Sequence, residues 1–280
     1  MIPAEFDYAR PSSVDEALSA LREGGEDAKL LAGGHSLLPL MKLRLAAPTL
    51  LVDLGGVPGL SGITRSNGGW SIGPMTTHAA MARESALGLA STVAGTIADP
   101  QVRHRGTIGG SLAHGDPASD QLAVLLASEG SVVVRGGSGE REIAAADLFE
   151  DYLTTAIADD EVITEVRLPA LEGYGFGYHK FNRRKEDWAM VAVSAQVRKA
   201  ADGSCEDVRV GLTHMSSVPL RATAVEEALR GGPLTADAIA AAAEQAAEGT
   251  DPPGDLNATP DYKRHLARVL CRRALTDAAA

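Results

Sequence analysis

The sequence predicts an α+β fold, in which an N-terminal α/β part is followed by a smaller C-terminal domain of antiparallel strands and helices. Two observations support this. Up to about residue 170, short β-like runs alternate with helical segments, whereas beyond Pro169 the strand-like segments come first and the helical ones follow. A chain of 280 residues is long enough for one large domain or for two or three small ones. We expect the first domain to cover residues 1–170 and the second to cover residues 171–280.

The N-terminal part begins with a predicted helix, "SVDEALSALRE" over Ser13–Glu23, for which Ser12 or Ser13 is the expected N-cap. Its apolar residues recur at helical spacing and are Val14, Ala17, Leu18 and Leu21. A second stretch, "HAAMARESALGLASTVAGTIA" over 78–98, predicts one or two helices capped by Thr76 or Thr77. Apolar or alternating runs predict the strands of this part, which are expected within 28–34, 49–56, 69–77, 131–137 and 161–169. The run "AKLLAGG" over 28–34 is interpreted as a buried strand that leads into a turn.

The C-terminal part begins with "GYGFGYHKFNRR", in which glycine, aromatic and basic residues alternate. Two strand-like runs over 188–199 and 207–217, joined by the turn-like "AADGSCED", predict an antiparallel pair. Three helical segments follow, over 220–231, 234–249 and 261–275. In the last of these, one face carries Leu266, Val269, Leu270 and Ala274.

The composition excludes several classes of function. A formal net charge of -11 argues against a nucleic-acid-binding surface and against binding to an anionic membrane. No apolar run approaches the roughly 20 residues of a transmembrane segment, and the N-terminus has no signal-peptide pattern, so we expect a cytoplasmic protein. The two cysteines, Cys205 and Cys271, lie far apart and are expected to be free buried thiols. Neither a disulfide framework nor an iron–sulfur cluster held by this chain alone is expected.

Two glycine pairs with similar flanking residues are the most informative local feature. One lies in "AGGHS" over Ala32–Ser36, and the other in "IGGS" over Ile108–Ser111, preceded by Thr107. Successive glycines let backbone amides converge on one anion, and nearby hydroxyls add donors. Two such nests could hold the two phosphates of a dinucleotide, although either pair alone could be a simple turn.

Common signatures of other site types are absent from the sequence. It contains no P-loop GxxxxGK[ST], no GxGxxG that opens a helix, no HExxH and no GxSxG. The seven histidines are scattered without the spacing of metal ligands. Hydrolytic and metal chemistry on this chain therefore have no residue-level support.

Four motifs together resemble one family, the FAD-carrying flavoprotein (medium) subunits of molybdenum hydroxylases. They are "LAGGHSLLPLMKLRLA", "IGPMTTHAAM", "ADPQVRHRGTIGGSLAHGDPASD" and "YHKFNRRKEDWAMVAV", and they occur in the order found in the family. Within it, the sequence looks most like the medium subunits of aerobic carbon monoxide dehydrogenases. His35 stands where many relatives have Gln, a change common in that branch.

The resemblance implies a vanillyl-alcohol-oxidase/PCMH-type FAD-binding domain of two α/β subdomains, about 1–55 and 56–170, followed by a small flavoprotein C-terminal domain. It also implies that FAD binds noncovalently between these parts of the chain. The first pyrophosphate loop would consist of Ala32, Gly33, Gly34, His35 and Ser36. The second would consist of Thr107, Ile108, Gly109, Gly110 and Ser111.

Further positions match the family outside the two loops. Asp120 matches an aspartate that accepts a hydrogen bond from FAD, Val162 or Ile163 matches an apolar contact, and Lys180 matches a lysine near FAD. Trp188 falls where an aromatic residue often lies by the flavin ring. Each has an alternative interpretation: Asp120 as a helix N-cap, Lys180 as a solvated strand residue and Trp188 as a core residue. His35 and His114 could simply form local hydrogen bonds beside the loops.

The resemblance further implies an electron-transfer role, with no catalytic acid or base on this chain. A large molybdenum–cytosine-dinucleotide subunit would oxidise the substrate, and a small subunit would relay electrons through [2Fe–2S] clusters to FAD, in a dimer of heterotrimers. An external acceptor such as a quinone would receive the electrons, at the inner face of the membrane if the complex docks there. The alternatives are the medium subunit of a xanthine, aldehyde or N-heterocycle hydroxylase, a stand-alone FAD oxidoreductase, and an interaction protein whose glycine loops are only turns.

Overall fold

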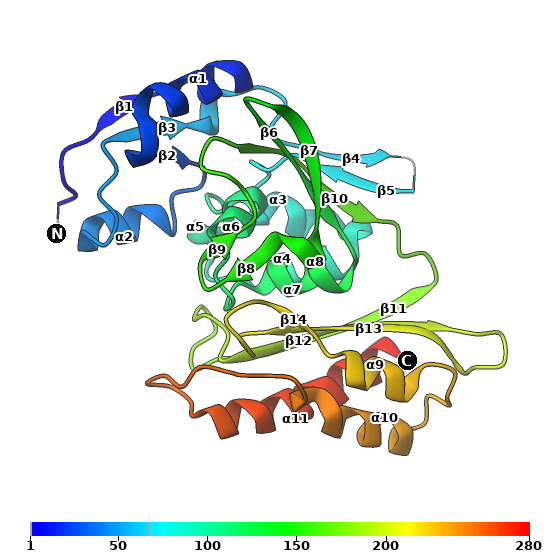
Figure 1. Cartoon of the computed structure of the whole chain (residues 1–280). Helices are drawn as coiled ribbons and strands as arrows, with labels where there is room; N and C mark the ends of the chain where they lie inside the picture. Colours follow the sequence, from blue (N-terminus) through cyan, green and yellow to red (C-terminus); the bar gives the residue numbers. More distant parts are fainter. Residues whose placement is uncertain (1, 67) are drawn as a thin grey trace.

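The computed structural model describes residues 2–66 and 68–280, and its elements form three stacked units (Figure 1). The N-terminal unit is a parallel sheet of order β1-β3-β2 packed against a helix. Its elements are β1 (Asp7–Ala9), α1 (Val14–Gly24), β2 (Ala28–Leu31), α2 (Leu37–Leu43) and β3 (Leu50–Asp53). The prediction of α1 is confirmed, and Ser13 is its N-cap because its hydroxyl accepts the backbone N–H of Glu16. Strand β1 was not predicted.

Strand β2 is less buried than its apolar sequence predicts. Ala28 is buried, but Leu30 and Leu31 are half-buried. The reason is that β2 is an edge strand, and Leu30 lines a cavity while it also packs against the core beneath α1. The expectation of a buried strand at this position is therefore wrong.

The middle unit is an antiparallel sheet of order β4-β5-β10-β6-β7 with helices on one side. Its strands are β4 (Ile63–Ser66), β5 (Gly69–Ile72), β6 (Ser131–Gly136), β7 (Gly139–Ala144) and β10 (Val162–Pro169), and β8 (Phe149–Asp151) pairs with β9 (Thr154–Thr155). Its helices are α3 (His78–Arg83), α4 (Leu89–Ala94), α5 (Pro100–Arg103), α6 (Ile108–His114), α7 (Asp120–Ala127) and α8 (Ala145–Leu148). Two helices, α3 and α4, occupy 78–98 as expected, and Thr77 caps the first of them.

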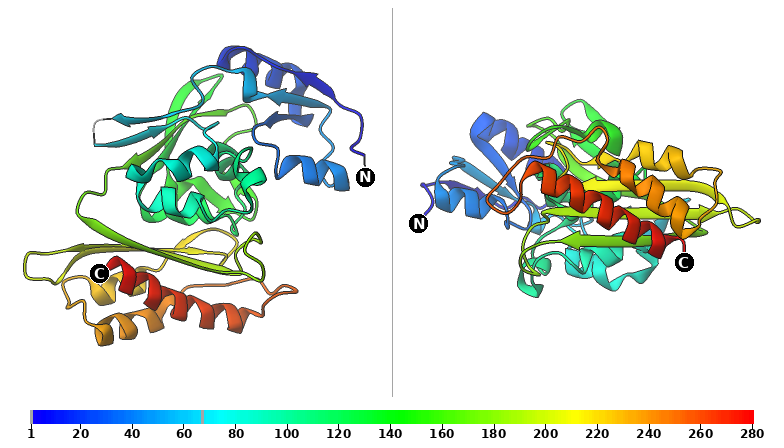
Figure 2. Two further views of the ribbon diagram at one scale, coloured as in Figure 1. Left: turned by 180° about the vertical axis from the view of Figure 1, so that it is seen from behind. Right: turned by 90° about the horizontal axis from the view of Figure 1, so that it is seen from below.

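The C-terminal unit is an antiparallel sheet of order β11-β12-β13-β14 with helices on its outer face, as Figure 2 also shows. Its elements are β11 (Tyr174–Phe181), β12 (Val191–Lys199), β13 (Cys205–Thr213), β14 (Leu220–Arg221), α9 (Thr223–Leu229), α10 (Ala236–Ala243) and α11 (Pro260–Ala278). The predicted antiparallel pair and the three helical segments are confirmed. Both cysteines are free and buried in this unit, as expected.

Helix α7 lies between the middle sheet and the C-terminal sheet, because it packs against α4 as well as β12 and β13 (Figure 1). This position explains its strongly apolar sequence, since a helix covered on all sides needs no polar face. Every residue from Asp120 to Leu125 is buried. The helix therefore presents Asp120, at its first turn, to the boundary between the two units.

The alternating sequence of β11 follows from its two different neighbours. Successive side chains of a strand point to opposite faces. On one face, α11 packs directly on the strand, and a Cβ at Gly177 would overlap the carbonyl oxygen of Ala274. On the other face, Tyr178 and Lys180 point toward α7. The glycines thus allow the close helix, and the alternate residues reach the middle unit.

Within the described residues, no helix combines the length and apolarity that crossing a bilayer requires.

Candidate functional site

The first glycine segment follows the end of β2 and runs into α2. Gly34 has a φ of 78°, in the left-handed region that favours glycine. The carbonyl oxygens of Gly34 and Ser36 accept from the first turn of α2. In contrast, no backbone N–H of residues 33–36 donates a hydrogen bond within the described part of the chain. Because unpaired amides need a partner, this segment offers a group of free donors to a ligand.

The second glycine segment is not the loop that the sequence predicts. Thr107 is the N-cap of α6, and Ile108–Ser111 form the first turn of that helix. All four of its amides already donate within the protein: Ile108 to Thr76 O at 3.1 Å, Gly109 to Pro74 O at 2.8 Å, Gly110 to Thr107 Oγ1 at 3.1 Å and Ser111 to Thr107 O at 3.1 Å. The expectation of two equivalent amide nests is therefore corrected. Thr107 and Ser111 of this segment contribute hydroxyls, and Gly109 and Gly110 form a part of the wall that carries no side chain.

The two segments nevertheless converge. An added Cβ at Gly33 would overlap the carbonyl oxygen of Arg105 and lie 2.8 Å from the Cα of Gly106, so the first segment contacts the backbone that leads directly into the second. An added Cβ at Gly110 would lie 3.4 Å from the Cβ of Ala32. The glycines thus permit the two segments to approach each other, in addition to any ligand.

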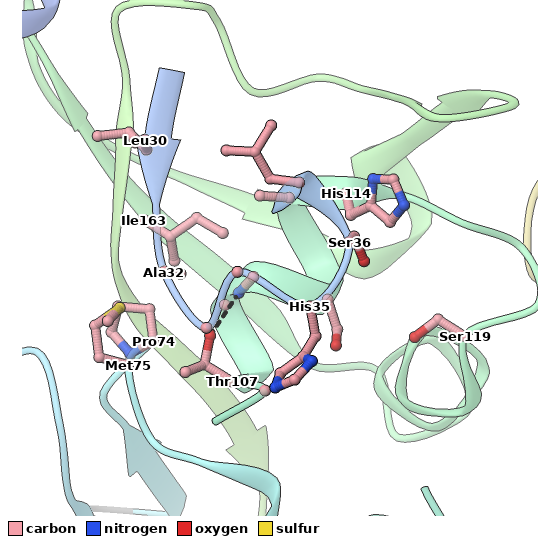
Figure 3. A pocket seen from close by; sticks show the side chains of 18 of the residues that line it. Leu30, Ala32, His35, Ser36, Pro74, Met75, Thr107, His114, Ser119 and Ile163 are labelled. Atoms are coloured by element: carbon pink, nitrogen blue, oxygen red, sulfur yellow. Dashed lines mark hydrogen bonds between the residues drawn. The ribbon is translucent and has the colours of Figure 1, made fainter. Parts of the chain in front are cut away.

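Both segments line one cavity of about 570 Å³. In Figure 3, Ala32, His35 and Ser36 of the first segment and Thr107 of the second lie around the same space. Its walls also include residues of β2, β10 and β11. The volume falls within the roughly 300–1,000 Å³ of ligand pockets in proteins.

A buried ion pair forms part of the cavity wall. Asp120 is 5% exposed, and its Oδ2 accepts from Lys180 Nζ at 2.7 Å while its Oδ1 accepts from Tyr178 OH at 2.8 Å. Burial raises the pKa of Asp120, and Lys180 and Tyr178 partly offset that effect. Burial and the neighbouring Asp120 raise the pKa of Tyr178 well above its ordinary value. The trio therefore joins the middle and C-terminal units and offers hydrogen-bonding groups to a ligand.

A buried histidine lies beside the second segment. His78 is 3% exposed, lines the cavity and has its Nε2 3.2 Å from the Oγ of Ser111. Burial, together with the positive charge of Arg103, lowers the pKa of His78 from 6.5 to about 4. His78 is therefore neutral near pH 7.

The sequence of this chain matches two known families of protein domains. The family described as "FAD binding domain in molybdopterin dehydrogenase" matches residues 4–171, and the "CO dehydrogenase flavoprotein C-terminal domain" matches residues 176–278. The chain is a member of this FAD-binding family of molybdopterin dehydrogenases.

The similarity extends over the whole chain. This flavoprotein is 40% identical to the carbon monoxide dehydrogenase medium chain of Hydrogenophaga pseudoflava, over 100% of its own length and 99% of the relative's. It is 39% identical to the nicotine 6-hydroxylase medium subunit of Paenarthrobacter nicotinovorans, over 98% of its own length and 97% of the relative's. A solved structure of Hydrogenophaga pseudoflava carbon monoxide dehydrogenase superposes with a TM-score of 0.96 and 42% identity, covering 99% of this chain and 98% of that one.

FAD is thus the cofactor of this flavoprotein, and the residues present fit it. A dinucleotide carries two linked phosphates, which need several hydrogen-bond donors close together. The free amides of residues 33–36 supply such donors, and no Cβ of Gly33 or Gly34 shields them.

Most of the sequence-predicted site residues of the flavoprotein meet at the cavity. Those that line it are Ala32, Gly33, Gly34, His35, Ser36, Thr107, Gly109, Gly110, Ser111, Asp120, Lys180 and Trp188. Two predicted residues point elsewhere. Ile108 packs in the core of the middle unit, and Val162 packs in the core beneath α1. Because side chains alternate along β10, Ile163 rather than Val162 lines the cavity.

The alternative interpretations of three residues are wrong. Ser119 precedes α7 as its N-cap residue, so Asp120 is not the cap. The side chain of Lys180 is 8% exposed and paired, so it is not a solvated residue. Trp188 is 57% exposed at the cavity, so it is not part of the core.

Two residues of the site were missed. Tyr178 lies in the quoted motif "YHKF", and its spacing of two from Lys180 on a strand would have placed both on one face. His78 lies in "IGPMTTHAAM", a motif that matched the family without any role for this residue. Nothing in the sequence alone could show that His78 meets Ser111.

Proposed function

We propose that this flavoprotein binds FAD noncovalently in the cavity and transfers electrons from a partner subunit to an external acceptor. The observation that carries the proposal is the convergence of the two glycine segments on one cavity whose wall also contains the buried Asp120–Lys180 pair. One segment has free amides, and the pair offers a carboxylate and an ammonium group. The cavity thus combines donors for a diphosphate with polar groups for a ring system.

The residues of this chain bind and orient the cofactor. The amides of residues 33–36 would hold the diphosphate, and the hydroxyls of Ser36, Thr107 and Ser111 would add donors. The Asp120–Lys180 pair, held in place by Tyr178, would offer hydrogen bonds to the polar groups of the cofactor. Trp188, which lines the cavity and is 57% exposed, would lie beside the ring and would become less exposed when FAD binds. FAD itself, when bound, supplies the redox chemistry that no side chain provides.

The electron donor belongs to another chain in this proposal. Both cysteines are buried in the C-terminal core, so they are not placed to hold a cluster at the cavity. We infer that a small subunit supplies [2Fe–2S] clusters and that a large subunit with molybdenum–cytosine dinucleotide oxidises the substrate, in a dimer of heterotrimers. The names of the relatives, medium chain and medium subunit, support a multi-subunit enzyme.

The proposed substrate of the complex is carbon monoxide. His35 and the identity of 40% to a carbon monoxide dehydrogenase medium chain favour it. An N-heterocycle such as nicotine is the second candidate, because the identity to the nicotine 6-hydroxylase medium subunit is 39%. The cavity of this chain does not distinguish carbon monoxide from nicotine as the substrate, because in this proposal the substrate binds to the large subunit. A quinone is the proposed acceptor.

The test is purification of the native complex, followed by three measurements. We expect one FAD per copy of this chain, release of that FAD on denaturation, and reduction of an artificial dye by carbon monoxide. Dye reduction by nicotine but not by carbon monoxide would favour the N-heterocycle hydroxylase. Activity with a small molecule in the absence of any partner subunit would identify a stand-alone oxidoreductase. Failure of the chain to retain FAD, even after reconstitution, would favour the interaction protein and refute the proposal.

A further inference from the structure

His78 comes from the motif "IGPMTTHAAM", and the proposed function gives it no role. Its ring is held firmly. The backbone N–H of His78 donates to Gly106 O at 3.0 Å, and Thr77 caps the helix that begins with His78. An added Cβ at Gly106 would lie 3.0 Å from the Cδ2 of His78, so the ring lies beside the backbone that leads into the second segment. The imidazole therefore lies between the backbone of Gly106 and the hydroxyl of Ser111.

The two ring nitrogens have different surroundings. Nε2 lies 3.2 Å from the Oγ of Ser111. Nδ1 is buried and has no hydrogen-bond partner among the described residues. The ring is neutral near pH 7, because burial lowers the pKa of His78 to about 4. One nitrogen therefore carries a hydrogen and the other carries a lone pair, and two tautomers are possible.

The burial of Nδ1 decides between them. If Ser111 donated its hydroxyl proton to Nε2, the hydrogen would be on Nδ1 as a buried donor without an acceptor. Orphaned buried N–H groups are rare in proteins, and an unmet acceptor is tolerated more often. If Nε2 carries the hydrogen instead, it donates to Ser111 Oγ, and only a lone pair of Nδ1 is left unpaired.

The second tautomer changes what Ser111 can do. Its oxygen accepts from His78, so its own hydrogen is available, and Ser111 lines the cavity. Its only side-chain hydrogen bond within the described part of the chain is the one to His78. The amide of Ser111 is already used by Thr107 O. The hydroxyl is thus a donor that this residue still offers to a ligand.

We propose that His78 is a positioning residue, whose Nε2–H donates to Ser111 and thereby directs the Ser111 hydroxyl proton toward a phosphate oxygen of FAD. The inference rests on the proposed function, because it takes the FAD diphosphate as the acceptor. A hydrogen bond to a charged oxygen is stronger than one between neutral groups. A histidine that fixes the direction of this hydroxyl would therefore increase the affinity for FAD without touching the cofactor.

The test compares variants of the full-length protein after its flavin has been removed. The side-chain amide nitrogen of Gln lies near the place of Nε2, whereas that of Asn lies near the place of Nδ1. We expect Ser111→Ala to weaken FAD binding about 10- to 100-fold, which corresponds to one hydrogen bond to a charged group. His78→Asn should weaken it about 10-fold, and His78→Gln should stay within about threefold of wild type, because it keeps the donor.

The decisive measurement is the double variant. If His78 acts through Ser111, adding His78→Asn to Ser111→Ala should change the dissociation constant less than about twofold, because the hydroxyl that His78 directs is gone. A purely structural role would instead give independent, multiplied losses. Quenching of flavin fluorescence measures the dissociation constant, and circular dichroism confirms that each variant is folded. Multiplied losses, or an unchanged affinity of Ser111→Ala, would overturn the inference while leaving the proposed function intact.

A second readout does not depend on FAD. In protein labelled with ¹⁵N-histidine, the chemical shifts of the ring nitrogens should show the hydrogen of His78 on Nε2 at pH 7. A hydrogen on Nδ1 would overturn the inference. Failure of the wild-type protein to bind FAD would overturn both this inference and the proposed function, so the two failures are distinguishable.

Discussion

The contact between the two glycine segments predicts a large effect of one added methyl group. In Gly33→Ala, the new Cβ would overlap the carbonyl oxygen of Arg105 and lie 2.8 Å from the Cα of Gly106. These atoms belong to the backbone, so no side chain can rotate away. The two segments must separate by several tenths of an ångström or more.

Two costs follow from that separation. Overpacking of a tight site costs about 1–3 kcal/mol of folding free energy. In the proposed binding mode, displacement of residues 33–36 would also pull their amides away from the phosphates, and each hydrogen bond to a charged group is worth about 1.5–3 kcal/mol. Loss of one such bond weakens FAD binding by about 10- to 100-fold. We therefore expect Gly33→Ala to be less stable and to bind FAD at least about 10-fold more weakly than wild type.

Urea unfolding and titration of the flavin-free protein with FAD measure the two effects. Gly137→Ala is the matched control, because a Cβ there would meet no atom closer than Arg22 Nη1 at 3.7 Å, an ordinary contact. The control should keep wild-type affinity and change stability by less than about 1 kcal/mol. If Gly33→Ala matched the control in both measurements, the close contact between the segments would not exist as described, and the reasoning would be refuted.

Three further predictions concern buried ionisable side chains. Lys180→Met leaves the Asp120 carboxylate buried without its cation, so we expect the free energy of unfolding in urea to fall by about 3–5 kcal/mol. Adding Asp120→Asn should restore most of that stability, and a loss below about 1 kcal/mol for Lys180→Met would contradict the prediction. Lys263 is fully buried and paired with the partly exposed Asp255. Asp255→Asn leaves a buried ammonium group without its partner and should destabilise the protein by about 3 kcal/mol, whereas Lys263→Met leaves only a partly exposed carboxylate and should cost much less. A larger loss for Lys263→Met than for Asp255→Asn would contradict this prediction. The pKa of His78 is about 4 in the folded protein, against 6.5 when solvated, so as the pH falls below 6.5 the unfolded chain binds a proton that the folded chain does not. From pH 6.5 down to pH 4, wild type should therefore lose up to about 3 kcal/mol more stability than His78→Gln, and parallel pH profiles would contradict this.

Local chemistry accounts for the features that the sequence alone determined. Helical spacing and a capping serine define α1, and alternation defines β10. These signals depend on neighbours within a few residues, so they can be recognised in the sequence itself. The glycine pairs, with their hydroxyl-bearing neighbours, likewise predicted two segments that the structure brings to one cavity.

Long-range packing decided the rest. The contact of Gly33 with Gly106 and the bond of Tyr178 to Asp120 join residues far apart in the chain. The sequence could not show that the amides of Ile108–Ser111 are already used, because their acceptors in part lie in another segment, at Pro74 and Thr76. Nor could it show which of Val162 and Ile163 faces the cavity, since both are apolar and only the placement of β10 between two cores assigns the faces. Local residue chemistry specifies which groups are available, whereas tertiary packing determines which of them remain free to bind a ligand.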